Sequence, residues 1–163
     1  QRLPMTVMYR RPRMAWLEPI MVAGRSRWQA TVAPASLSGV RQFYRTLRQG
    51  GTVGLLPDQV PSGGEGVWAD FFGRPAYTMT LVRRLQRATG AAIVMVFAER
   101  LAGGRGYHMH FEEVPTAQFD EAALNRAIEA QIRRRPEQYL WSYRRHKSPR
   151  GADAPPPAKA EAC

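Results

Sequence analysis

The chain has 163 residues, of which 44% are hydrophobic, and this is enough for one domain with a buried core. It carries 24 lysines and arginines against 13 aspartates and glutamates, so its formal net charge is +11. A surplus of this size implies an anionic partner: nucleic acid, a phosphorylated substrate, an acidic carrier protein or a membrane surface. The single cysteine, Cys163, excludes a disulfide framework or a cysteine-based metal site within one chain.

The chain starts at Gln1 and enters a strand-like segment, residues 5–9, almost at once. Natural domains seldom begin so abruptly, and we therefore expect that an N-terminal part is missing. No apolar run approaches the ~20 residues of a membrane-spanning helix, and no signal-peptide pattern stands at the start.

Strand-like and helix-like patterns alternate through the first third of the sequence. The predicted order is strand 5–9, helix 14–23, basic loop 24–27, strand 28–33, helix 38–49 and strand 52–56. The second helix rests on an apolar stripe and stops at Gly50-Gly51. The last strand is continuously apolar, as in a parallel sheet that is covered on both faces.

The alternation continues toward the C-terminus. The predicted order is loop 57–66, helix 78–89, strand 91–98, turn 103–106, strand 107–114 and helix 120–134. Residues 91–98 look like the most deeply buried strand, and the last helix carries its stripe on Leu124, Ile128 and Ile132. We expect an α/β fold with a mostly parallel sheet flanked by helices over residues 1–147, and a disordered tail, rich in proline and alanine, over 148–163.

Asp58 and Gln59 follow the predicted strand 52–56 directly. Ligands of parallel sheets bind at the carboxyl ends of strands, so this carboxylate and amide are candidates for orienting a substrate or for holding an arginine. An ordinary turn explains Pro-Asp equally well.

Arg25 lies in a basic loop, and its planar guanidinium suits a phosphate or a carboxylate, although a solvated basic surface is the simpler explanation. Phe71 and Phe72, with Trp68, are candidates for lining an acyl groove, although core packing is the commoner fate of such rings.

His108 and Glu113 have the His-(four residues)-Glu spacing of a general base and its orienting carboxylate. On a strand these positions point to opposite faces, so we interpret the spacing as coincidental. His108 and His110 share a face, but the sequence shows no third ligand, and we expect no metal site and no catalytic residue in this chain.

Basic clusters at residues 133–135 and 144–147 flank an aromatic segment, 136–141. Such interleaving suits nucleic acid or an anionic membrane surface, and it also suits a solvated helix end.

Five short motifs, in order, resemble the C-terminal part of the bacterial lipid A biosynthesis (lauroyl/myristoyl) acyltransferases, within the lysophospholipid acyltransferase superfamily. They are Met8-Tyr9-Arg10, Gly24-Arg25, Leu56-Pro57-Asp58-Gln59, Phe71-Phe72-Gly73 with Pro75, Ala76 and Thr78, and Pro136 to Trp141 with Arg144, Arg145 and Lys147. The resemblance covers roughly residues 4 to 148. The family's His-(four residues)-Asp/Glu motif stands upstream of its Tyr-Arg strand, and this chain begins after it.

The resemblance implies transfer of a fatty acyl chain from acyl carrier protein, the donor, to a hydroxyl of a lipid A precursor, without a cofactor. It implies work at the cytoplasmic face of the cell inner membrane, with no nucleic acid as partner, and little activity from this piece alone. It assigns substrate binding to Arg25, Asp58, Gln59, Phe71 and Phe72, with Asp58 as the candidate for pairing with Arg25 or positioning the sugar hydroxyl. Two alternatives stay open: a basic nucleic-acid-binding module, and an acyltransferase of the same superfamily that acts on another lipid.

Overall fold

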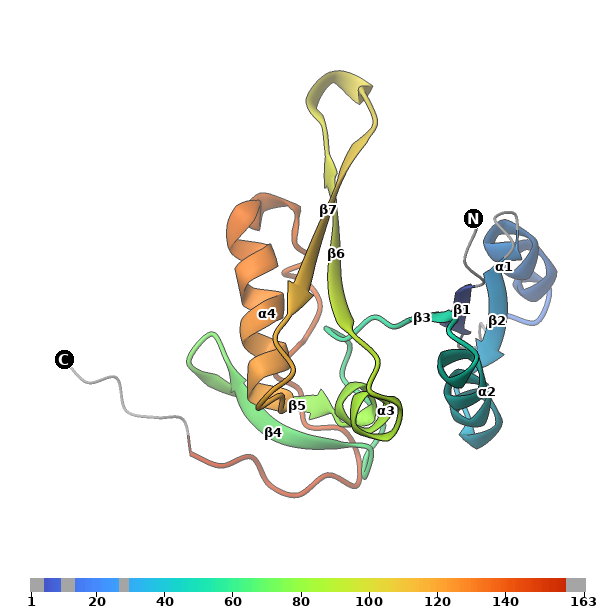
Figure 1. Ribbon diagram of the computed structural model, residues 1–163. Helices are drawn as coiled ribbons and strands as arrows, with labels where there is room; N and C mark the ends of the chain where they lie inside the picture. Colours follow the sequence, from blue (N-terminus) through green and yellow to red (C-terminus); the bar gives the residue numbers. More distant parts are fainter. Residues whose placement is uncertain (1–4, 10–13, 27–29, 158–163) are drawn as a thin grey trace. The chain divides into compact units, whose positions relative to one another are not determined.

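A computed structural model describes residues 5–9, 14–26 and 30–157 of the chain (Figure 1). The chain divides into two compact units. The N-terminal unit runs to Leu56 and includes Arg87–Ala91, and the C-terminal unit contains Pro57–Gln86 and the chain from Ala92 onward. Each unit is described by itself.

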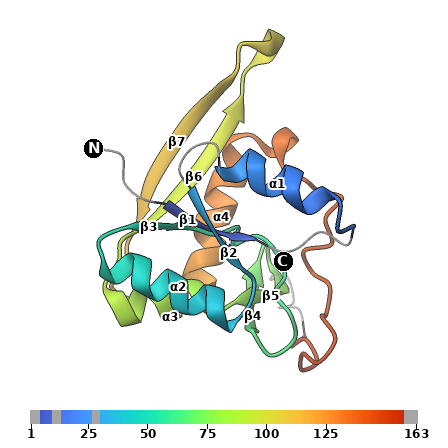
Figure 2. The same ribbon diagram turned by 90° about the vertical axis from the view of Figure 1, so that its right-hand side faces the viewer.

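The N-terminal unit is built on a parallel sheet of three strands in the order β2-β1-β3. The strands are β1 (Met5–Tyr9), β2 (Ala30–Pro34) and β3 (Thr52–Gly54), and the helices α1 (Leu17–Ser26) and α2 (Leu37–Arg48) connect them. Figure 2 shows the two helices on either side of the strands. The predicted stripe of α2 is confirmed, with Phe43 fully buried. Alternating strands and helices thus give a parallel sheet here, as expected.

Two boundaries in this unit differ from the prediction. Helix α1 begins at Leu17 and continues to Ser26, so Gly24 and Arg25 belong to a helix instead of a basic loop. Pro19 is tolerated because it stands in the first turn, where backbone N–H groups need no partner within the helix. Strand β3 ends at Gly54, and Leu56 is 64% exposed, so the apolar run outlasts the strand.

The C-terminal unit adds two antiparallel hairpins to the parallel sheet of the N-terminal unit, so the whole fold is α/β with one parallel sheet and two small antiparallel ones. The first pairs β4 (Gly66–Phe71) with β5 (Arg74–Met79), and the second pairs β6 (Ile93–Arg100) with β7 (Tyr107–Val114). Helix α3 (Leu81–Thr89) follows β5, so residues 78–79 are strand and not the start of a helix. Short 3₁₀ helices occupy Ala102–Gly104 and Pro136–Gln138.

Helix α4 (Glu121–Arg134) packs on β4, β5 and β6 and organises the core of this unit. Asp120 caps it by accepting a 2.7 Å hydrogen bond from the Ala123 N–H. The predicted stripe is confirmed, because Leu124, Ile128 and Ile132 are buried together with Phe71 and Phe119. Figure 1 shows α4 lying along β6 and β7.

Residues 91–98 were expected to form the most deeply buried strand, and this is wrong. Alternate residues of β6 are exposed, with Val94 at 49% and Val96 at 50%, whereas Ile93 and Met95 pack against the core. A two-stranded hairpin has only one face to press against α4, and an unbroken apolar run carries no signal of which face that is.

None of the helices in the described ranges has the length and apolarity that a membrane crossing requires. Residues 148–157 contain no helix or strand, yet the backbone oxygen of Asp153 accepts a 2.9 Å hydrogen bond from the Trp68 indole. The disorder predicted for the tail stays a prediction.

Candidate functional site

The turn between β4 and β5 places an aromatic residue, Phe72, in a strained backbone conformation. Phe71 pairs with Arg74, which leaves Phe72 and Gly73 as a two-residue turn. Their φ angles are 50° and 75°, as two-residue hairpin turns often require. Glycine adopts this region freely, whereas phenylalanine does so at a cost of about 1–2 kcal/mol. Surrounding contacts must therefore hold Phe72 in place.

Helix α4 supplies two of those contacts. Glu129, 8% exposed, accepts a 2.8 Å hydrogen bond on Oε1 from the Phe72 N–H. Its Oε2 accepts a 2.9 Å bond from Nη2 of Arg133, whose guanidinium lies 4.8 Å from the centre of the Phe72 ring. The buried carboxylate thus fixes the turn and orients a cation over the aromatic ring.

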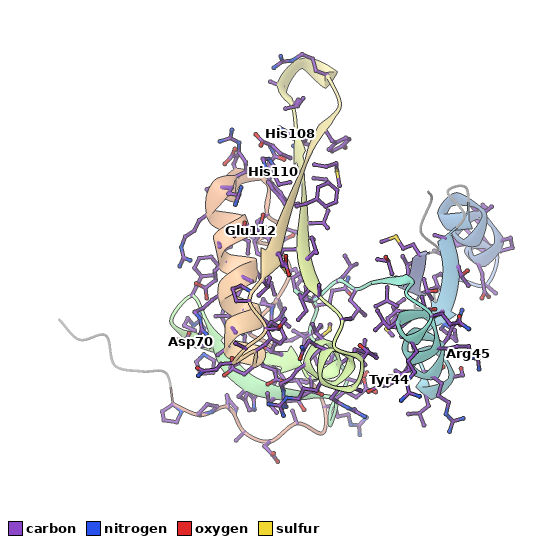
Figure 3. The ribbon with its side chains drawn as sticks, in the orientation of Figure 1. Tyr44, Arg45, Asp70, His108, His110 and Glu112 are labelled. Carbon is purple, nitrogen blue, oxygen red and sulfur yellow. The ribbon has the colours of Figure 1, made fainter. Side chains whose placement is uncertain are left out.

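An open pocket of about 460 Å³ lies beside this turn. Its walls include Asp70, Phe72, Ala122, Arg126, Glu129 and Arg133. Glu129 is already engaged, while Arg126 is exposed and so is most of the Arg133 side chain. Two guanidinium groups next to an aromatic ring suit a ligand that is both anionic and apolar. Figure 3 labels Asp70 at the edge of this region.

Arg145 is a buried cation, so it does not belong to the surface cluster that the sequence suggested for residues 144–147. It is 3% exposed, and its guanidinium donates to Tyr77 O at 2.8 Å, Thr78 Oγ1 at 2.9 Å and Asn125 Oδ1 at 3.1 Å. The guanidinium also lies 5.1 Å from the Phe71 ring centre. Burial lowers the pKa of Arg145, and interactions with Tyr139, Tyr143 and, least, Asp58 oppose this shift in part. Arg145 therefore locks the C-terminal segment onto β5 and α4.

Asp58 lies in a turn after β3 and not at a strand end. It belongs to the same unit as the segment 136–147, and its charge reaches that segment: burial, and then Asp58, raise the pKa of Tyr139. Nearby, the hydroxyl of Tyr143 accepts a 2.8 Å hydrogen bond from the Val60 N–H. The loop that carries Asp58 and the exposed Gln59 is thereby tied to the C-terminal segment.

The structure brings some of the predicted site residues together. Phe71 is a core residue, 2% exposed, and its ring meets that of Phe72 edge-on at 4.9 Å. Phe72 alone of the two lines the pocket. Arg25 belongs to α1 in the other unit, and its side chain lies outside the described residues, so its pairing with Asp58 stays a prediction.

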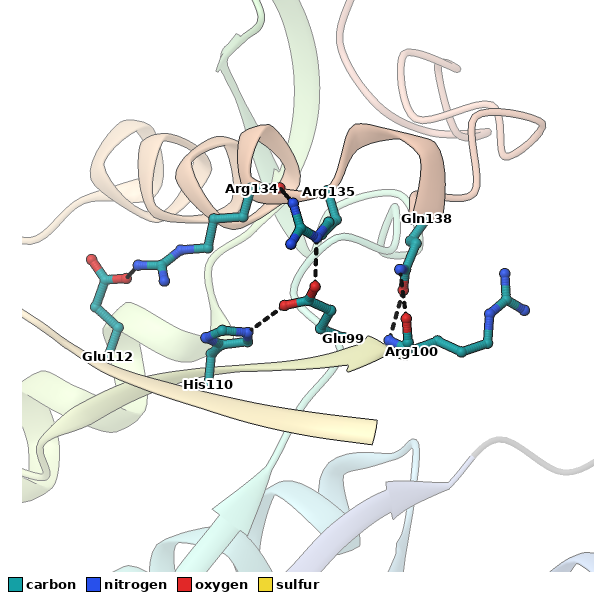
Figure 4. Close-up of polar contacts among 7 residues, drawn as sticks. All are labelled: Glu99, Arg100, His110, Glu112, Arg134, Arg135 and Gln138. Carbon is teal, nitrogen blue, oxygen red and sulfur yellow. Dashed lines mark hydrogen bonds and ion pairs between the residues drawn. The ribbon is translucent and has the colours of Figure 1, made fainter. Parts of the chain in front are cut away.

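A second polar network joins the β6–β7 hairpin to the end of α4 (Figure 4). Glu99 accepts from Arg135 Nε at 2.5 Å on Oε1 and contacts His110 Nε2 at 2.8 Å through Oε2. The hydrogen bonds from Arg135 and His110 hold the pKa of Glu99 below its usual value. Gln138 bonds both the N–H and the carbonyl of Arg100.

The pair with the general-base spacing falls on opposite faces of β7. His108 lies across from Glu99, whereas Glu113 pairs with Val94 on the exposed face. The interpretation of that spacing as coincidental stays a prediction. The sequence offered only two candidate metal ligands, His108 and His110. The structure adds a third, Glu99, which approaches both histidines from the neighbouring strand.

Sequence reasoning also missed Glu129, Asn125 and the burial of Arg145. Glu129 and Asn125 fall on the buried side of α4 beside Leu124 and Ile128, and a polar residue at core-facing spacing is a usable signal for a buried hydrogen bond. Arg145 offers no such signal, because arginine and lysine surround it in the sequence.

The N-terminal unit has a polar pocket of its own, about 390 Å³, which includes Thr6, Gln42, Arg45 and Thr46 in its walls. The hydroxyls of Thr6 and Thr46 lie 3.0 Å apart. Figure 3 shows Arg45 on α2. The pocket has few apolar atoms from large side chains, so it suits a polar ligand better than an acyl chain.

Comparisons with known proteins agree with one another. The family profile described as bacterial lipid A biosynthesis acyltransferase matches residues 1–148. The lipid A biosynthesis palmitoleoyltransferase of Escherichia coli (strain K12) is 32% identical over 151 residues, which cover 89% of this chain and 49% of that protein. A lipid A biosynthesis acyltransferase of Haemophilus influenzae is 28% identical over 148 residues, 86% of this chain and 45% of that protein. The lipid A biosynthesis lauroyltransferase of Escherichia coli is 30% identical over 116 residues, 67% of this chain and 38% of that protein.

The chain thus spans about half the length of the curated relatives it matches. The profile covers nearly all of this chain. The chain belongs to the bacterial lipid A biosynthesis acyltransferase family.

Proposed function

We propose that this chain supplies substrate-binding parts of an enzyme that moves a fatty acyl chain from acyl carrier protein to a hydroxyl of a lipid A precursor, at the cytoplasmic face of the inner membrane. The observation that carries the proposal is the pocket beside Phe72, where Arg126 and Arg133 stand next to an aromatic ring. Lipid A precursors combine phosphates with acyl chains. The two guanidinium groups of this pocket suit the phosphates, and the aromatic ring suits an acyl chain.

The roles of the residues follow from their chemistry. Arg126 and Arg133 bind a phosphate or another anionic group of the acceptor, and Phe72 lies against an acyl chain. Glu129 positions both Arg133 and the Phe72 backbone and does not contact substrate. His108 and Glu113 lie on opposite faces of β7, so we assign no general base to them. Transfer would then use a base other than these two residues, and a base is worth about 10²–10⁴-fold in rate.

Binding of the acceptor tests the proposal without requiring turnover. Detergent-dispersed lipid A precursor is titrated into the 163-residue chain, with its dephosphorylated form as the comparison ligand. We expect Arg126→Gln to weaken binding of the phosphorylated form about tenfold, since a charge-assisted hydrogen bond contributes about 1.5–3 kcal/mol. The dephosphorylated form should bind weakly to both proteins.

Arg87→Gln is the matched control, because Arg87 is exposed and lies outside the pocket, and the variant loses the same charge. Equal losses from Arg126→Gln and Arg87→Gln would show that only net charge matters. That result would contradict the assignment of the pocket.

A further inference from the structure

Two histidines and a glutamate converge on the α4-facing side of the β6–β7 hairpin. His108 and His110 are two residues apart on β7 and so share a face, and Glu99 pairs directly with His108 from β6. The two imidazole rings are stacked with centroids 4.4 Å apart. One ligand atom from each of the three residues lies within 4.8 Å of the others. Figure 3 shows both histidines along the same side of β7.

The carboxylate of Glu99 is held by its surroundings. Oε1 accepts from Nε of Arg135, at the end of α4, and this leaves Oε2 directed at His110. A hydrogen bond that orients a ligating carboxylate in this way is typical of metal sites. The Glu99 side chain is 14% exposed and that of His110 is 24% exposed, whereas His108 is exposed, so a solvated ion can enter past His108.

A purely structural ion-pair network explains Glu99, His110 and Arg135 but leaves His108 without a role. In the described part of the chain, the His108 ring stacks on that of His110, and its side chain forms no hydrogen bond. An imidazole placed within reach of a second imidazole and of an ionised carboxylate completes a His₂Glu donor set. Zinc uses this set, with water in the remaining position, and imidazole ligands also suit copper and nickel.

We propose that Glu99, His108 and His110 bind a divalent transition-metal ion of the zinc class, with water completing the coordination. The ion takes the place of the proton that His110 and Glu99 share. Their 2.8 Å contact must open by about 0.5 Å, since two ligands of a tetrahedral zinc ion stand about 3.3 Å apart. The cation of Arg135 opposes the charge of the ion, so we expect binding weaker than that of a closed structural zinc site.

Calorimetric titration of zinc chloride into the full 163-residue chain tests the proposal. All proteins carry Cys163→Ser, because a free thiolate binds zinc. We expect one ion per chain, and a loss of about tenfold or more in affinity for each of His108→Ala, His110→Ala and Glu99→Ala. The matched controls are Glu113→Ala, on the opposite face of β7, and His146→Gln, the remaining histidine of the chain. Both should bind zinc as the parent does.

Nitrogen-15 NMR of the histidine rings provides a readout that does not depend on how the variants fold. Zinc should shift the ring nitrogens of His108 and His110 in the parent protein and leave those of His146 unchanged. Shifts at His146, or at no histidine, would overturn the proposal. Undiminished binding by Glu99→Ala would also overturn it, because it would reduce the site to an ordinary surface pair of histidines.

Discussion

At the scale of single residues, tertiary contacts hold Phe72 in a backbone conformation that phenylalanine seldom adopts. Its φ of 50° is costly for a side chain with a Cβ, yet its ring packs against Phe71, Trp141 and the Arg133 guanidinium. The Glu129 carboxylate accepts its N–H as well. These contacts offset the strain, so the turn keeps its shape with phenylalanine at this position.

Replacing Phe72 by glycine or by alanine separates the strain from the packing. Both variants lose the ring, so the difference between them reports the backbone alone. We expect Phe72→Gly to be more stable than Phe72→Ala by about 0.5–1 kcal/mol, because only alanine keeps the left-handed penalty. Urea unfolding of the two variants measures the difference.

Val67, on strand β4 and 40% exposed, is the control position. There the order should reverse, with Val67→Ala more stable than Val67→Gly, as in ordinary strands. The same order at both positions would show that Phe72 carries no backbone strain.

Arg145 illustrates a buried charge whose hydrogen bonds run to neutral oxygens. Its removal would take one hydrogen-bond donor away from each of the buried oxygens of Tyr77, Thr78 and Asn125. We expect Arg145→Ala to lower the free energy of unfolding by about 3 kcal/mol. The neighbouring Arg144 is exposed, and Arg144→Ala should change stability by less than about 0.5 kcal/mol. Thermal and urea unfolding of both variants test this, and equal small effects would refute the locking role of Arg145.

At the scale of elements, a helix or strand was predicted correctly where several sequence features indicated it. It was predicted poorly where a single feature did. Helix α4 has both an apolar stripe and the Asp120 cap, and its bounds were predicted closely. Strand β6 had only an apolar run, so its pairing and its exposed face could not be inferred. The β4–β5 hairpin was missed because its turn places Phe72 where glycine or asparagine is usual.

The candidate site was predicted unevenly for the same reason. The sequence identified Phe72 from its aromatic-glycine segment, but Glu129 and Arg133 meet it only through tertiary packing. Glu99 reaches His108 only once β6 and β7 pair, and spacing along the chain carries no trace of that pairing.

The hydrogen bond between Glu99 and Arg135 joins β6 to the end of α4, and its contribution to stability should depend on pH. Hydrogen bonds from Arg135 and then from His110 lower the pKa of Glu99 in the folded chain. A lowered carboxyl pKa contributes stability that is present above the unfolded pKa and is lost as the pH falls through the folded pKa. We therefore expect the free energy of unfolding to decrease below the usual glutamate range, and Glu99→Gln to flatten this decrease.

Urea unfolding at a series of acidic pH values measures the effect. Glu113→Gln is the control, since Glu113 is exposed on the opposite face of the hairpin and should leave the pH profile unchanged. A parent profile that matches that of Glu99→Gln would show that the contact with Arg135 adds no stability.

At the scale of the whole molecule, the net charge of +11 attracts the chain to anionic surfaces. Basic residues near an anionic membrane contribute about 1 kcal/mol each, and salt screens them over a Debye length of about 10 Å at 0.1 M. Exposed Leu140 and Trp141 stand between the basic clusters and suit the headgroup region. Charge alone attracts nucleic acid as well, so the two surfaces must be compared directly.

We expect the chain to sediment with anionic phospholipid vesicles at about 0.05 M salt, to be released by about 0.5 M salt, and to ignore neutral vesicles. Trp141→Ala should reduce sedimentation with anionic vesicles, whereas binding to duplex DNA should be weak and unaffected by this substitution. DNA binding that is tight, increases with duplex length and weakens steeply with salt would instead favour a nucleic-acid-binding module. Because vesicles and DNA share the same charge attraction, only the apolar contribution of Trp141 separates them, and the vesicle assay with this variant is the deciding measurement.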